Sequence, residues 1–382
     1  MAIVQDQGSM FMHRRDVVCG GGAVMFSALL ASLLGGTKPV WAQGISGPVP
    51  EVDRVAIRVV VDSYQIAVAP SLKAGSVEVE RFGWPLSDQP PHKAIISEFG
   101  LSLHTESRRG SEVRNMLVDF GFTADALLNN SELLDVDPAA LDALVLSHGH
   151  YDHFGGLVGF LQQNKGLLKP NLPLYVGGEE CFCSRQWTAP PLKGNFGALD
   201  RKALEGANVK VTFAEAPALV ADHAFTTGQI DLASFERVLS PSAMKIGVQT
   251  GIGCYPEQFS ASERQQGVIP DQFRHELATS FNLKGRGLVV LTSCSHRGVV
   301  NAIKRAQAVS GISKVHAVIG GFHLAPYPVE YVHQSVAALK EIDPDYVIPL
   351  HCTGEPFYEI FKAEMPSKLL RSFTGTRFVL NA

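Results

Sequence analysis

Three histidines and one aspartate fall within six consecutive positions, at His148, His150, Asp152 and His153. Imidazole and carboxylate groups are the ligands that zinc and similar divalent ions take in proteins. His148 and His150 are two residues apart, so their side chains point the same way where a strand ends. Asp152 and His153 come after the turn and can face a second ion. The pattern H-x-H-x-D-H therefore predicts the first half of a two-metal site.

The residues around this motif predict a strand before it and a helix after it. The apolar run 141–146 predicts a buried strand, and a helix is expected over about 155–163. The C-terminal part repeats this arrangement with three predicted strands that each end at a histidine, namely 287–292 at His296, 314–319 at His323 and 345–350 at His351. Ligand sites in α/β folds lie beyond the carboxyl ends of strands, so these histidines should gather at one edge of the sheets.

Other runs predict the remaining elements of the fold. Apolar and β-branched runs predict strands at 54–61, 93–104, 115–121, 172–176, 209–213, 224–227 and 377–380, and helical patterns lie at 123–130, 298–308, 329–342 and 356–364. Thr123 is expected to cap the first of these helices. The middle of the chain, residues 179–286, is less regular and rich in Pro, Gly, Gln and Ser. We expect insertions and substrate-side loops there, because specificity usually lies on loops.

The N-terminus has the layout of an export signal. Arg14 and Arg15 form a basic pair, an apolar run follows over 19–34, and a small-residue cleavage site ends at Ala42. The arginine pair indicates the twin-arginine route. The predicted organisation is thus a signal over residues 1–42 and a mature domain over 43–382, located in the periplasm or outside the cell. An uncleaved membrane anchor is the alternative, although the apolar run is short for a membrane span.

Composition limits the partners of the mature chain. The 382 residues carry a formal net charge of −4 and contain no basic run, which argues against nucleic acid as the main partner. A small-molecule substrate is expected instead, without stable membrane insertion of the mature chain. Six cysteines are present, and five remain after the signal is removed, so the odd number argues against a full disulfide framework. Cys294 and Cys352 lie beside candidate ligands and should pack near the metals, either as small buried residues or as soft ligands.

Residues 147–156, with the sequence SHGHYDHFGG, resemble the signature of the metallo-β-lactamase superfamily. The resemblance extends to the branch of dihydropterin–ribofuranosylaminobenzene phosphate synthases, through stretches at 98–102, 118–121, 227–230, 294–296 with 320–324, and 351–354. It covers roughly residues 93–354. The resemblance implies an αββα sandwich with two mixed sheets and outer helices. The metals are then expected at one edge of the sandwich.

The resemblance also implies two ligand sets. The first metal would be held by His148, His150 and His296, and the second by Asp152, His153 and His351. Many members of the superfamily bridge the metals with an aspartate, whereas this chain has Phe322 and His323 at the corresponding place. His323 is therefore a candidate ligand, a candidate acid that faces the substrate, or a residue that supports the ligands. Asp119 is expected to orient a ligand histidine, because carboxylates often fix the tautomer of zinc-bound imidazoles.

Zinc ions in such a site would activate water and allow a metal-bound hydroxide to attack an ester, lactone, amide or phosphodiester. Asp152 or His323 could then carry the proton to the leaving group. A zinc-dependent, dinuclear hydrolase is the expected function, with synthase activity discounted because an exported protein is poorly placed for an intracellular pterin pathway. Iron or manganese suit similar ligands, which leaves an iron-dependent redox or sulfur-handling enzyme as one alternative. A non-catalytic metal-binding protein is the other. The sequence does not indicate an oligomeric state.

Overall fold

The computed structural model describes residues 40–41, 44–83, 88–189 and 194–382. The predicted export signal lies outside the described residues except for positions 40 and 41. Within the described part, no helix has the length and apolar character needed to cross a membrane.

The first of two main sheets is mixed and has ten strands. Its strands are, in spatial order, β1 (Val40–Trp41), β12 (Val209–Phe213), β9 (Leu172–Val176), β8 (Leu141–Val145), β7 (Glu112–Val118), β6 (Ser102–Arg109), β3 (Arg54–Val61), β23 (Arg377–Asn381), β5 (Val77–Glu80) and β4 (Leu72–Ala74). The strands from β1 to β7 pair in parallel, and those from β7 to β4 pair antiparallel.

The second main sheet is also mixed. Its order is β13 (Ala218–Val220), β14 (Ala224–Thr226), β19 (Thr279–Leu283), β20 (Gly287–Leu291), β21 (Val315–Gly321) and β22 (Tyr346–Leu350), and β2 (Glu51–Val52) pairs with β19. The strands β20, β21 and β22 run in parallel, so their carboxyl ends lie together. The other pairs along this order are antiparallel.

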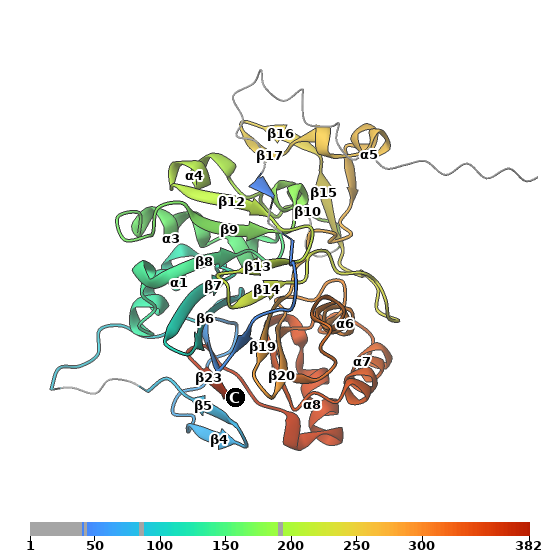
Figure 1. Ribbon diagram of the computed structural model, residues 1–382. Helices are drawn as coiled ribbons and strands as arrows, with labels where there is room; N and C mark the ends of the chain where they lie inside the picture. The colour runs from blue at the N-terminus through green and yellow to red at the C-terminus, as the bar shows by residue number, and fades with distance from the viewer. Residues whose placement is uncertain (1–39, 42–43, 84–87, 190–193) are drawn as a thin grey trace, which may run out of the picture. The chain divides into compact units, whose positions relative to one another are not determined.

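Apolar side chains define four layers. Buried residues such as Ile57, Val118 and Ile319 from both sheets form one core between them. A second core joins the outer face of the first sheet to α1 (Ala124–Leu133), α3 (Leu157–Gln163) and α4 (Arg201–Gly206), and a third joins the second sheet to α6 (Val299–Ser310), α7 (Val329–Ile342) and α8 (Glu355–Glu364). Figure 1 shows the two groups of helices beside their respective sheets. The order helix, sheet, sheet, helix is the predicted αββα sandwich.

Most predicted elements are confirmed within one to four residues at their ends. Thr123 caps α1 as expected, because its side chain accepts a hydrogen bond from the backbone N–H of Ala126. The helix expected over 155–163 is confirmed as α3, and a further short helix, α2 (Tyr151–Phe154), precedes it within the motif.

The strand predicted over 93–104 is wrong for its first part, since β6 begins at Ser102. The backbone N–H and carbonyl of Ile96 form hydrogen bonds with the side chain of Asn130, not with a neighbouring strand. Its N–H donates to Oδ1 of Asn130 at 2.9 Å, and its carbonyl accepts from Nδ2 of Asn130 at 2.7 Å. A buried amide side chain on α1 therefore satisfies the backbone groups that a neighbouring strand would otherwise have bound.

The middle segment, 179–286, is more regular than the sequence indicated. It supplies β12, β13, β14 and β19 to the main sheets. It also forms a four-stranded sheet of β11 (Gly194–Asn195), β10 (Ser184–Trp187), β15 (Ser242–Lys245) and β18 (Val268–Pro270), a hairpin of β16 (Gly247–Gln249) and β17 (Ile252–Cys254), and the helix α5 (Ala261–Gln266). Short 3₁₀ helices lie at Pro138–Ala140, Glu179–Phe182, Pro256–Gln258, His351–Thr353 and Pro366–Lys368. A disulfide between Cys183 and Cys254 ties this segment together.

Candidate metal centre

The candidate ligands all follow strand ends on one edge of the sandwich. His148 and His150 lie directly after β8, and Asp152 and His153 lie on the short helix α2 that follows. In the second sheet, the three histidines that follow parallel strands are His296 after β20, His323 after β21 and His351 after β22. The sheets thus bring together side chains as far apart in the sequence as His148 and His351, which are 203 residues apart (351 − 148).

The six candidate ligands form two groups in the structure. The ligand atoms of His148, His150 and His296 lie within 4.8 Å of one another, and all three side chains are buried. The ligand atoms of Asp152, His153 and His351 lie equally close together and are also buried. These groupings have the same members as the two sets that the sequence resemblance implied.

Several nitrogen and oxygen atoms at this edge are buried without a hydrogen-bond partner among the described residues. They include Nε2 of His148, Oδ1 of Asp152 and both ring nitrogens of His296 and His351. Nε2 of His351 does lie 3.3 Å from Oδ2 of Asp152, at ion-pair distance but without hydrogen-bond geometry. A buried polar atom without a partner costs about 1–3 kcal/mol, so a cluster of them indicates a missing partner such as a metal ion. The donor set fits zinc and similar ions.

Asp119 fixes the orientation of one histidine from each set. Val118 pairs with Val145 between β7 and β8, which places Asp119 beside the metal-binding turn. Oδ2 of Asp119 lies 2.7 Å from Nδ1 of His153 and accepts a hydrogen bond from Oγ of Ser147, also at 2.7 Å. The oxygen of that hydroxyl lies 2.9 Å from Nδ1 of His148 and accepts a hydrogen bond from its N–H group, because the hydroxyl proton is donated to Asp119. Both rings then carry their proton on Nδ1 and keep the Nε2 lone pair for a metal.

His296 is held by two neighbours that sequence reasoning did not assign a role. The carboxylate of Glu276 accepts the backbone N–H groups of His296 and Arg297 at 2.7 and 2.8 Å, which fixes the turn after β20. The ring of Phe273 stacks on the imidazole of His296, with centroids 3.8 Å apart and planes inclined by 14°. The sequence does place an acidic residue, Glu276, before β20, the strand that leads to His296. It does not show that the Glu276 carboxylate binds the backbone N–H groups of that turn.

The turn that carries His148 and His150 rests on a buried arginine. A Cβ added to Gly149 would lie 2.5 Å from Nη1 of Arg185, so only glycine fits this place without movement. The guanidinium of Arg185 is completely buried and pairs with Asp271 at 2.9 Å. Nε2 of His275 accepts the backbone N–H of Gly149 at 3.1 Å. These supporting residues come from segment 179–286 and were missed because no local motif marks them.

Burial and neighbouring charges set the protonation of the ligands. Burial lowers the pKa of His148, His150 and His296 well below the usual value, so the three imidazoles are neutral and can donate to a metal. For His351, burial alone would lower the pKa, but Cys352 and Asp152 raise it to about 9.

A cavity of about 410 Å³ opens over both ligand sets. Its wall includes His150, Asp152, His296, His323 and His351. Three aromatic side chains from different parts of the chain also line the cavity, namely Phe99, Trp187 and Phe196, and the rings of Phe99 and Phe196 lie beside those of His351 and His150. Such a cavity, apolar with convergent polar groups, is typical of small-molecule sites.

Comparison with known proteins agrees with the fold and the motif. The model of the metallo-beta-lactamase superfamily matches residues 110–166, which include the motif. The structure of Tm1679, a metal-dependent hydrolase of the β-lactamase superfamily, superimposes with a TM-score of 0.60 over 85% of this chain and 98% of that protein, at 23% identity. The chain therefore has the fold of the metallo-β-lactamase superfamily, and its motif lies in the segment that matches the model of that superfamily.

Two proteins from the archaeon Methanocaldococcus jannaschii are similar to this chain in sequence. One is named 7,8-dihydropterin-6-methyl-4-(β-D-ribofuranosyl)-aminobenzene-5′-phosphate synthase and is 27% identical over 281 residues, which cover 73% of this chain and 89% of the relative. The other is uncharacterised and is 22% identical over 271 residues, or 70% of this chain and 89% of the relative. The resemblance to the synthase branch is thus confirmed as a sequence relationship.

His323 differs from the six grouped residues of this metallo-β-lactamase fold. It is half-buried and lines the cavity, its ring lies 4.1 Å from that of His296, and neither ring nitrogen has a hydrogen-bond partner among the described residues. Its ligand atom also groups with those of His296 and Cys294. The imidazole is placed both to approach a metal and to meet a substrate.

Proposed function

We propose that this protein is a zinc-dependent hydrolase with two metal ions, one held by His148, His150 and His296 and the other by Asp152, His153 and His351. The observation that carries the proposal is the pair of buried ligand groups, whose unpartnered atoms converge beneath a single cavity. Zinc ions bound in this way lower the pKa of water to near 7 and polarise a substrate oxygen.

Other residues of the chain would orient the ligand histidines and transfer protons. Asp119 keeps Nε2 of His148 and His153 unprotonated. His323 faces the cavity with free ring nitrogens, which suits it to pass a proton to a leaving group, and the carboxylate of Asp152 is a second candidate for that role. Burial alone would raise the pKa of Asp152, but His153 and His351 lower it, so Asp152 is a carboxylate at neutral pH.

The cavity indicates the class of substrate. Phe99, Trp187 and Phe196 give its more exposed part an apolar surface, whereas the buried wall carries imidazoles, one carboxylate and two thiols. We expect a small molecule with an apolar or aromatic part and a hydrolysable ester, lactone, amide or phosphodiester that reaches the metals.

Metal analysis and a substrate panel test this function. The mature protein, expressed from Gln43, should bind about two equivalents of zinc and hydrolyse at least one ester, lactone or phosphodiester substrate. His148→Ala should lose metal and activity, whereas His333→Ala, which changes an exposed histidine on α7, should lose neither. Absence of metal from the wild-type protein would refute the proposal.

A redox or sulfur-handling enzyme with iron is the second candidate function. The observation in its favour is Cys294, whose Sγ lies 3.1 Å from Nε2 of His153 and adds a soft donor to the site. Iron in the purified protein, with an absorption spectrum that changes on reduction, would favour this candidate over hydrolysis.

We also propose that the protein is exported through its N-terminal signal. The disulfide between Cys183 and Cys254 supports this, because such bonds persist in oxidising compartments such as the periplasm. Replacement of both Arg14 and Arg15 by lysine should leave the full-length precursor in the cytoplasm, as measured by cell fractionation. Export of the variant at the normal rate would contradict the twin-arginine route.

A further inference from the structure

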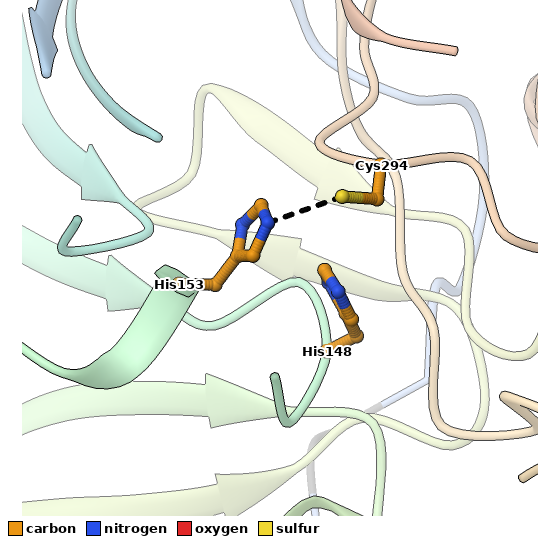
Figure 2. Close-up of side chains that lie close together, drawn as sticks. All are labelled: His148, His153 and Cys294. Carbon is orange, nitrogen blue, oxygen red and sulfur yellow. Dashed lines mark hydrogen bonds between the residues drawn. The ribbon is translucent and has the colours of Figure 1, made fainter. Parts of the chain in front are cut away.

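The thiol of Cys294 lies between the two ligand sets, and the proposed metal sites do not use it. Cys294 follows β20 and is buried. Figure 2 shows its sulfur beside the rings of His148, from the first set, and His153, from the second. The sulfur lies 3.1 Å from Nε2 of His153. That nitrogen is the one Asp119 leaves unprotonated for a metal.

The same sulfur is close to further members of both sets. Its ligand atom groups within 4.8 Å with those of His148 and His153, with that of His296, and with that of His351. Two of these four histidines belong to each set. A donor atom in this position can bind both ions at once. A donor atom close to the members of only one set could bind only one ion.

The chain has no carboxylate directly after β21, the place where many members of the superfamily carry the aspartate that bridges their metals. After Gly321 the chain continues with Phe322 and His323. Phe322 is buried and packs against Phe357, with ring centroids 5.2 Å apart, so it points into the core under α8 and away from the metals. The sulfur of Cys294 lies between the ligand sets, and no carboxylate at the end of β21 competes with it for the ions.

We propose that Cys294 bridges the two metal ions as a thiolate. The inference rests on the two-metal part of the proposed function and names a ligand beyond the six imidazole and carboxylate ligands. On binding, the thiol loses its proton to solvent and the sulfur forms a bond to each ion, at about 2.3 Å for zinc. Cys352 has its sulfur 3.4 Å from that of Cys294 and groups with His351 of the second set, so it provides the matched control.

X-ray absorption of the zinc-loaded wild-type protein tests the bridge directly. A thiolate shared by two ions gives about one sulfur per zinc at about 2.3 Å, whereas a thiolate on one ion gives about half a sulfur per zinc. The inference expects the first result, and the second would overturn it. A disulfide between Cys294 and Cys352 in the metal-loaded protein, detected by mass spectrometry, would also overturn it.

Cobalt substitution of two variants assigns the sulfur. Cys294→Ser should remove the thiolate-to-cobalt charge-transfer band in the near ultraviolet and weaken binding of at least one ion, and Cys352→Ser should keep both. The opposite pattern would overturn the inference. Circular dichroism of Cys181→Ser, a buried cysteine away from the cavity, controls for the loss of a buried thiol.

Failure of the bridge and failure of the proposed function give different results. Two zinc ions without sulfur, together with hydrolysis of a test substrate, would refute the bridge and leave the hydrolase intact. A sulfur-bridged pair of ions in a protein that hydrolyses no substrate in the panel would support the bridge and count against the hydrolase.

Discussion

Replacement of Asp119 by asparagine should weaken metal binding without removing any ligand. The carboxylate accepts three hydrogen bonds, from the N–H and the Oγ of Ser147 and from Nδ1 of His153, at 2.8, 2.7 and 2.7 Å. Asparagine has one oxygen and one amide nitrogen at the same place. The nitrogen can donate but cannot accept, so at least one of the three bonds is lost in either orientation of the side chain.

The two orientations have different costs. If the amide nitrogen faces His153, the ring must accept at Nδ1 and carry its proton on Nε2, which removes the lone pair that binds the metal. Loss of such supporting bonds typically costs about 10- to 100-fold in metal affinity, or about 1.4–2.7 kcal/mol. If the nitrogen faces Ser147 instead, its N–H group meets the buried backbone N–H, and the folded state loses about 1–3 kcal/mol.

Zinc titration against a competing chelator, together with urea unfolding of the metal-free protein, measures both costs. Asp142→Asn is the control, because its carboxylate lies on the neighbouring strand β8 and also accepts a backbone N–H, from Asn115 at 2.8 Å, but lies in neither candidate ligand group. Ser147→Ala should weaken only the set that contains His148. If Asp119→Asn matched the control in both zinc affinity and stability, the assigned role of this carboxylate would be refuted.

Three further predictions concern stability. Gly149→Ala should lose about 1–3 kcal/mol in urea unfolding, because the new Cβ meets buried atoms at 2.5 and 2.6 Å, whereas Gly166→Ala meets nothing within 4 Å and should match the wild type. Reduction of Cys183–Cys254, which are 71 residues apart, should lower the free energy of unfolding by about 4 kcal/mol, and a Cys254→Ser variant should not respond to the reductant. Burial raises the pKa of Glu236 from 4.5 to about 7. Between these values the folded protein keeps a proton that the unfolded chain releases. The free energy of unfolding should therefore fall by up to about 3 kcal/mol as the pH rises through this interval. Glu236→Gln removes this dependence, so the free energy of unfolding of the variant relative to wild type should rise between pH 5 and pH 8, and a constant difference would contradict the assignment.

Much of the fold could be predicted because its elements have local signals. The apolar runs of β3, β9 and α7 occupy the predicted residues without any shift at their ends. The failure at 93–101 has a tertiary cause, since Asn130 on α1 provides the hydrogen bonds that a strand partner would provide. A sequence pattern does not show that a distant side chain will replace a strand.

In the candidate site, too, some residues can be predicted from local sequence and others cannot. His148, His150, Asp152 and His153 are adjacent in the sequence, so their residue types alone indicate a metal site. Supporting residues act on turns that are distant in the sequence: Arg185 packs against Gly149, and Glu276 binds the backbone N–H groups of the turn after β20. No local motif marks Arg185, and the acidic residue before the ligand strand does not by itself show which groups it binds. The position of Cys294 between the sets required the packing of both sheets, although its closeness to His296 in sequence pointed to the same edge.

The histidines after the strands of the second sheet show how the site is prepared before a metal binds. His323 and His351 adopt left-handed backbone conformations, with φ of 47° and 49°, and Ser295 beside His296 does so with φ of 59°. Such conformations cost about 1–3 kcal/mol each in residues other than glycine.

Hydrogen bonds away from the metals hold two of these turns. The N–H of His351 donates to Oδ1 of Asp62 at 3.1 Å, and Oγ of Ser295 donates to the carbonyl of Gly321 at 2.8 Å. The fold thus places imidazoles from three strand ends around one point by means of backbone contacts that do not involve the ions. Because these hydrogen bonds stabilise the strained turns, the arrangement of the candidate ligands is a property of the folded chain, and the proposed metals would supply partners for the buried nitrogens.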